Sequence, residues 1–112
     1  MTLGAHPPTR HGSERVFVGT LTVNVLLGDV RSLKQKRSVV RPILADLRRK
    51  FAVAVAETGH QDLYRRVELG LATVADNAAH CQEVLDSCER LVAGRPEIEL
   101  LSAHQRLIGD ED

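Results

Sequence analysis

The sequence predicts a single α+β domain whose elements follow the order β-α-β-β-α-β, with both helices on one face of a four-stranded antiparallel sheet. Three observations predict this fold class. The 112 residues suffice for one core of two packed layers. Stretches with a two-residue apolar period alternate with stretches of helical period. The two middle strands follow one another without a helix between them, which is typical of a hairpin.

The first half of the chain predicts a strand and a helix. Residues 16–27, VFVGTLTVNVLL, alternate between one fully apolar face and one face of small, half-polar, mostly β-branched residues. Ser32 then begins a helix, because Ser32 and Gln35 fit a capping box. Pro42 lies inside this helix, which runs to about residue 50, and should kink it. The predicted core-facing stripe consists of Leu33, Val40, Leu44, Leu47 and Phe51, with Ile43 at its edge.

The second half predicts three more strands and a second helix. In order they are a short strand (52–57), a loop (58–66), a strand (67–75), an amphipathic helix (76–94) and a last strand (97–108). Asp76 or Asn77 caps the helix, and Gly94 followed by Pro96 ends it. The inward stripe of that helix is Cys81, Val84, Leu85, Cys88, Leu91 and Val92. With right-handed crossovers around the central hairpin, this order gives the ferredoxin-like arrangement.

The globular domain is expected over residues 16–108. Residues 1–15 are rich in Pro, His, Gly and charge without an apolar period, and predict a flexible extension; residues 109–112 form an acidic tail. No apolar run is long enough for a membrane span, and the first residues lack the apolar core of a secretory signal. The expected location is therefore cytoplasmic, with no membrane partner.

The two cysteines predict neither a disulfide nor a metal site. Cys81 and Cys88 are seven residues apart on one predicted helix, which places their α-carbons roughly 10 Å apart, beyond the reach of a disulfide. Metal ligands on one helix prefer spacings of three or four residues. Both thiols are expected in the core, and no metal or cofactor is predicted.

Charge is distributed unevenly although the formal net charge is zero. Residues 31–50 contain eight Lys or Arg and a single acid, Asp46. The basic residues 48–50 lie near the helix C-terminus, where the helix dipole favours cations, but those at the helix start oppose it. An anion bound there would explain them. The predicted RNA- or anion-binding residues are Arg31, Lys34, Lys36, Arg37 and Arg41; the alternative interpretation is the solvated outer face of a helix.

The open face of the sheet is expected to bind protein rather than nucleic acid. Its outward strand positions carry no aromatic side chain, so bases should not stack on it. A flat face of small and β-branched residues suits another sheet, and a homodimer through this face is expected.

The loop at residues 58–66 gathers polar groups that suggest a ligand or partner site: His60, Gln61, Asp62 and Tyr64. His60 and Asp62 could serve acid-base chemistry, but no nucleophile, metal ligand set or oxyanion site accompanies them. We therefore assign no catalytic residue and do not expect an enzyme. The alternative is structural, with Asp62 capping a turn and Tyr64 on the rim of the sheet.

Two segments, SLKQKRSVV and GHQDLYRRVELG, resemble the small bacterial YlxP-like family, a domain of unknown function, along nearly all of residues 17–108. The matching motif residues are Ser32, Leu33, Lys34, Lys36, Arg37, His60, Gln61 and Asp62. The resemblance implies a ferredoxin-like fold. The resemblance also implies a gene that lies beside those for translation initiation factor two and the ribosome-binding factor of small-subunit maturation. Such a gene neighbourhood suggests a role with the ribosome or RNA. The family supplies no agreed catalytic residues.

Two functions are consistent with these observations. The first is a non-enzymatic accessory factor in ribosome assembly or translation that binds RNA phosphates through the basic helix, with ribosomal RNA or a ribosomal particle as partner. The alternative is a small-molecule-sensing or oligomerisation module with a ligand near the loop at residues 58–66.

Overall fold

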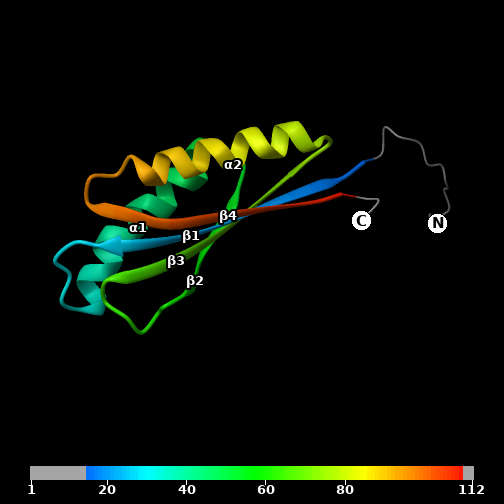
Figure 1. Cartoon of the computed structure of the whole chain (residues 1–112). Coiled ribbons are helices and arrows are strands. Elements are labelled where there is room, and N and C mark those ends of the chain that lie inside the picture. The colour runs from blue at the N-terminus through cyan, green and yellow to red at the C-terminus, as the bar shows by residue number, and fades with distance from the viewer. Residues whose placement is uncertain (1–14, 110–112) are drawn as a thin grey trace, which may run out of the picture.

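The computed structural model describes residues 15–109 and has the predicted order of elements (Figure 1). The elements are β1 (Phe17–Leu27), α1 (Leu33–Lys50), β2 (Ala54–Gly59), β3 (Arg66–Ala75), α2 (Ala78–Ala93) and β4 (Ile98–Ile108). The expected N-terminal extension, except Arg15, and the acidic tail, except Gly109, lie outside the described residues.

The four strands form one antiparallel sheet in the order β2-β3-β1-β4. The register places Val23 of β1 between Leu69 of β3 and Ala103 of β4. Helix α2 packs over β1, β3 and β4, and α1 packs over β2. The ferredoxin-like α+β fold is confirmed, and one face of the sheet is left without helices.

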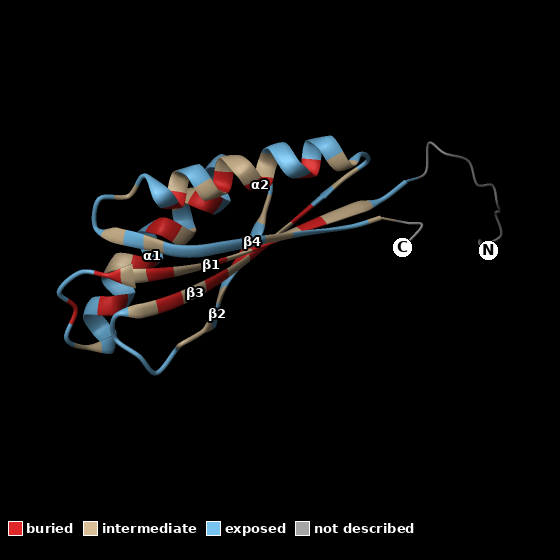
Figure 2. Cartoon of the chain, viewed as in Figure 1, coloured by how far each residue is buried: buried red, intermediate tan, exposed pale blue. Residues whose placement is uncertain are grey.

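The core lies between the sheet and the two helices, where Figure 2 shows the buried residues. On β1 and β3, alternate residues are buried as predicted, because successive side chains of a strand point to opposite faces. On α2 the buried residues are Cys81, Leu85, Cys88 and Val92, while Val84 and Leu91 are partly buried against the core. Burial of each large apolar side chain stabilises the fold by roughly 1.5–3 kcal/mol.

Gly19 allows α2 to lie close to β1. A Cβ at this position would be 2.9 Å from Leu85 Cδ1 and 3.2 Å from Cys81 Cβ, closer than packed carbon atoms allow. A side chain at residue 19 would therefore require Leu85 to change its packing or α2 to move away from the sheet.

Helix α1 begins as predicted but is rotated about its axis relative to the prediction. Ser32 Oγ accepts a hydrogen bond from Gln35 N at 3.1 Å. Gln35 Oε1 in turn accepts from the backbone N–H of Arg31, one residue before the cap, at 2.7 Å. The buried residues are Lys36, Val40, Ile43 and Leu47. Leu33 is exposed, whereas Leu44 and Phe51 are partly buried, so the buried arc is turned by about 40° from the predicted one.

Strand β2 is displaced by two residues toward the C-terminus relative to the prediction. It pairs with β3 from Ala54, opposite Ala72, to Gly59, opposite Glu68. The pairing shifts between Glu57 and Gly59, which leaves Thr58 as a bulge. Gly59, predicted to be a loop residue, belongs to the strand because it pairs with Glu68 of β3, and Thr58, also predicted in the loop, is included in the strand as the bulge. Val55 points inward, as predicted, and Ala54 and Ala56 point outward.

Candidate functional site

Three exposed basic residues form a stripe on one flank of α1: Lys34, Arg37 and Arg41, hereafter the basic stripe. They occur at helical spacing and span roughly 10 Å. Arg48 lies on the same flank farther along the helix, and its Nη2 donates a hydrogen bond to the carbonyl of Val55 at 2.9 Å. Because Val55 belongs to β2, the flank that carries the basic stripe faces the β2 edge of the sheet.

The basic stripe lacks compensating acids. Within residues 15–109, no carboxylate forms an ion pair with Lys34, Arg37 or Arg41, and the first turn of α1 contains no acid. Arg31 differs, since its Nε lies 3.1 Å from Asp29 Oδ1 in an exposed ion pair. The surface at the start of α1 is therefore positive, with part of the charge of Arg31 offset.

The single acid of the basic segment does not neutralise this stripe. Asp46 accepts from Arg49 at 2.9 Å and also pairs with Arg95, which follows α2. The hydrogen bond from Arg49, and after it the one from Arg95, outweigh partial desolvation and hold the pKa of Asp46 below its usual value. Asp46 is therefore ionised at neutral pH and joins the end of α1 to the chain after α2.

Lys36 is buried, so its predicted role as an RNA- or anion-binding residue is wrong. Its side chain is 3% exposed, and Nζ donates to the carbonyls of His60 at 2.8 Å and Leu63 at 2.7 Å. Nζ also forms an ion pair with the buried Glu57 Oε2 at 2.9 Å. A buried ammonium needs acceptors in place of water, and these three oxygens supply them.

The chain between β2 and β3, residues 60–65, is held at both ends; we call it the β2–β3 connection. Lys36 binds the carbonyls of His60 and Leu63. At the other end, Arg65 Nε donates to the carbonyls of Leu27 at 3.1 Å and Gly28 at 2.8 Å. The backbone N–H of Leu27 donates to the carbonyl of Arg65 at 2.8 Å. The connection therefore packs against α1 and the turn before it, and the two sequence segments with the family resemblance meet here.

The four residues predicted as a ligand or partner loop have different environments. His60 is half-buried and adopts a left-handed backbone conformation, with φ of 61°. Gln61 Nε2 donates to the carbonyl of Glu57 at 2.9 Å. Asp62 and Tyr64 are exposed, with Tyr64 at 48%. The adjacent Leu63 is also exposed, and nothing in the sequence pattern had singled it out.

The arrangement of titratable groups offers no metal centre among residues 15–109, where no group of three or more His, Cys, Asp or Glu side chains lies close enough to hold an ion. Cys81 and Cys88 are buried free thiols. Burial raises the pKa of Cys88 to about 11, so this thiol stays protonated at neutral pH and is a poor nucleophile. This agrees with the predicted core position of both cysteines.

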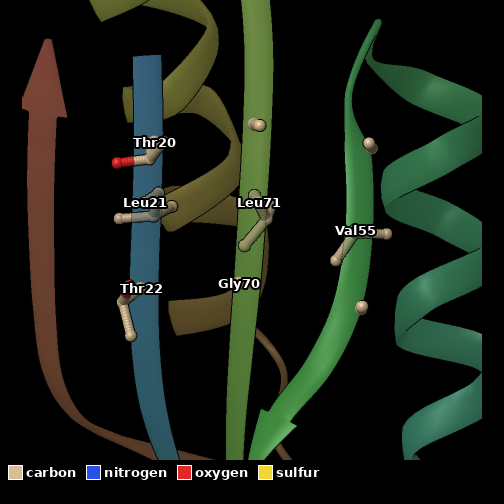
Figure 3. A pocket seen from close by; sticks show the side chains of 9 residues that line it. Thr20, Leu21, Thr22, Val55, Gly70 and Leu71 are labelled. Carbon is tan, nitrogen blue, oxygen red and sulfur yellow. The ribbon is translucent and has the colours of Figure 1, made fainter. Parts of the chain in front are cut away.

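The open face of the sheet contains a shallow hollow of about 340 Å³ across β1, β3 and β2 (Figure 3). Its outward-facing lining consists of small residues: Thr20, Thr22, Ala54, Ala56, Gly70 and Ala72. At one end of the face, the register brings Val74, Val18 and Ile108 into one row across three strands. Among the strand residues that the structure describes, this face carries no Phe, Tyr or Trp.

Neither described helix is both long and apolar enough to cross a membrane.

Comparison with known proteins gives a family match over most of the chain. A family model described as "Protein of unknown function (DUF503)" matches residues 18–105. The chain is 32% identical over 83 residues to "Uncharacterized protein YlxP" of Bacillus subtilis (strain 168), covering 74% of this chain and 90% of that protein. Among solved structures, the "De novo designed protein Foldit4" aligns with 86% of this chain and 96% of its own, at 13% identity and a TM-score of 0.43.

Proposed function

The chain belongs to the DUF503 family, and within this YlxP-like family we propose that it is a non-enzymatic accessory factor of ribosome assembly or translation in the cytoplasm. In this proposal it binds RNA phosphates through α1. The supporting observation is the basic stripe of Lys34, Arg37 and Arg41, which has no acidic partner in the described chain. The resemblance to a family whose genes lie beside translation genes favours ribosomal RNA, or a ribosomal particle, as the partner.

The position of the stripe supports an anionic partner. Lys34 lies in the first turn of α1 and Arg37 in the second, where the backbone N–H groups already present partial positive charge. Each cation near this helix start costs roughly 0.3–1 kcal/mol in the free protein, and a bound phosphate reverses the sign of that interaction. Arg31 extends the surface beyond the helix start, once its pairing with Asp29 is exchanged for a phosphate.

Binding of small-subunit ribosomal RNA over a series of KCl concentrations tests the proposal. Three phosphate contacts predict that log K falls with log[salt] with a slope of about −2 to −3. A Lys34→Glu, Arg37→Glu double variant should bind at least ~10-fold more weakly and show a shallower slope. A matched control is Lys50→Glu, Arg90→Glu, which makes the same change in net charge at exposed positions away from the stripe.

Equal loss of affinity in both double variants would indicate a nonspecific effect of net charge and contradict the assignment to α1. Affinity that does not depend on salt would contradict phosphate binding itself.

The alternative function, a small-molecule ligand held near residues 58–66, has less support. The ammonium of Lys36 already occupies the inner side of this loop, where it donates hydrogen bonds to the carbonyls of His60 and Leu63.

A further inference from the structure

We propose that Tyr64 stacks on an unpaired base, and that the surface formed by Tyr64 and the basic stripe binds single-stranded rather than duplex RNA. This inference rests on the proposed function and specifies the class of RNA that the surface takes. It depends on the position of Tyr64, on the exposure of its ring and on the charge beside it.

The backbone of Tyr64 is fixed on both sides by hydrogen bonds to α1 and to the turn before it. On one side, Lys36 Nζ binds the carbonyl of Leu63 at 2.7 Å. On the other, the carbonyl of Arg65 accepts from the backbone N–H of Leu27 at 2.8 Å, and Arg65 Nε donates to the carbonyl of Gly28 at 2.8 Å. Tyr64 is therefore presented from a restrained segment, which reduces the entropy lost when its ring packs on a base.

The same contacts place the β2–β3 connection, and with it Tyr64, against the start of α1, the part of the helix that carries the basic stripe. The position of the β2–β3 connection along the axis of α1 follows from Lys36, which donates hydrogen bonds to the connection and is the sequence neighbour of Arg37. The side of α1 that faces β2 follows from Arg48, which lies on the same flank as the stripe and donates a hydrogen bond to Val55 of β2. Strand β2 in turn leads into the β2–β3 connection. Figure 1 shows the start of α1 and the β2–β3 connection at the same end of the molecule.

Exposed apolar groups accompany the cations at this end. Tyr64, Leu63 and Leu33 are 48%, 45% and 39% exposed. An apolar ring surface beside cations without acidic partners matches a polyanion with flat, unpaired bases, because bases stack on aromatic rings while phosphates meet Lys and Arg. Asp62 is the exposed acid of the connection, and it offsets part of this charge.

The preference for single-stranded RNA follows from the stacking of a base on Tyr64. In a duplex, each base is stacked on its neighbours, so its face is closed to a side chain, whereas an unpaired base can be splayed onto an aromatic ring. The sheet offers no Phe, Tyr or Trp on its open face among the described residues, where His104 lies opposite Thr22, and Phe17 and Phe51 are partly buried. Tyr64 is thus the one exposed residue among the Phe, Tyr and Trp of the described chain.

The test compares a mixed-sequence RNA of about 16 nucleotides, alone and annealed to its complement, by fluorescence anisotropy. The single strand should bind more tightly to the wild type than the duplex does. Tyr64→Leu keeps the apolar bulk but removes the ring, and should weaken single-strand binding by roughly 5- to 150-fold, the range for one stacked base. Tyr64→Phe should retain the binding, and neither change should alter the salt slope, because no charge is removed.

Intrinsic fluorescence reads the same residue directly. The chain contains one Tyr and no Trp, so its tyrosine emission reports Tyr64 alone. Added single-stranded RNA should quench this emission in proportion to the bound fraction.

The outcomes separate the two proposals. If the Lys34→Glu, Arg37→Glu variant loses RNA while Tyr64→Leu binds like the wild type and the emission does not change, base stacking is overturned and phosphate binding stands. If the charge variant binds RNA as the wild type does, the proposed function itself fails, whatever Tyr64 does. Equal affinity for single strand and duplex would overturn the inference as well.

Discussion

Lys36 illustrates how a charged side chain can be part of the core of a small domain. It occupies the helix position one turn before Val40, and its long apolar stem lies in the buried arc while its ammonium reaches the carbonyls of the β2–β3 connection. The interaction joins α1 to a segment more than twenty residues away in sequence.

Replacing Lys36 should therefore destabilise the fold rather than weaken RNA binding at its surface. Lys36→Met keeps the stem but leaves the Glu57 carboxylate and two carbonyls without their partner, and should lower the free energy of unfolding by about 3 kcal/mol. Lys34→Met is the matched control, because Lys34 is exposed on the same helix, and its effect should stay within about 0.5 kcal/mol. Urea denaturation of both variants measures the difference, and equal stabilities would show that the buried ion pair contributes nothing.

The sequence predicted the exposure of some individual side chains and not of others. The exposed placement of Lys34, Arg37 and Arg41 followed from the helical period. The burial of Lys36 was also readable, since residues 36, 40, 43 and 47 recur at helical spacing, but a lysine among apolar residues suggested a solvated side chain. Its acceptors could not be predicted, because the carbonyls of His60 and Leu63 come from a distant turn.

Helix α1 is continuous from Leu33 to Lys50 although Pro42 lies in its middle. Proline there removes one backbone donor and crowds the preceding turn. The packing of Val40, Ile43 and Leu47 in the core compensates for this loss, because all three are almost fully buried.

Pro42→Ala should consequently stabilise the protein. Residue 42 is exposed, so the change removes no core contact and restores a backbone N–H that can pair with the carbonyl one turn earlier. The gain should approach about 3 kcal/mol if the helix needs no bend at this point. Thermal and urea denaturation measure it, with Arg41→Ala as the neighbouring exposed control. A loss of stability in Pro42→Ala would instead mean that a bend at residue 42 is needed to seat α1 on the sheet.

Element boundaries were predicted well where capping or turn residues mark them. Ser32 and Asn77 begin their helices as the sequence indicated, since each side chain accepts a hydrogen bond from the first turn. The boundary of β2 was predicted two residues early, because the extent of an edge strand depends on its partner. Glu68 of β3 pairs with Gly59 and so extends β2 beyond the run of alternating Ala and Val.

At the scale of the whole domain, residues 15–109 present two distinct surfaces, the basic end at the start of α1 and the open face of the sheet. The fold was predictable because every element carries a clear local period and the topology rules allow few ways of combining them. The meeting of α1 with the β2–β3 connection was not, because no local pattern encodes a contact between distant segments.

A homodimer through the open face remains a prediction. The hollow of small residues and the exposed row of Val74, Val18 and Ile108 favour contact with a second apolar surface, and Val74 is 66% exposed. Sedimentation at tens of micromolar protein, a range in which moderate dimers form, should give the mass of a dimer. Ala72→Lys places a charge in the hollow and should give a monomer, whereas Glu83→Lys, exposed on α2, should leave the dimer intact. A monomeric wild type would rule out this mode of self-association.

The burial of Lys36 also determines which lysine amines of this protein are accessible to chemical reagents and modifying enzymes. Lysine occurs at positions 34, 36 and 50 of the chain. The amine of Lys36 is enclosed and carries three oxygen partners, so acylating reagents and lysine-modifying enzymes meet only Lys34 and Lys50 among the side-chain amines of the folded domain. One of these two lies in the basic stripe, so a single acylation at Lys34 would remove about a third of the charge by which that stripe attracts phosphate.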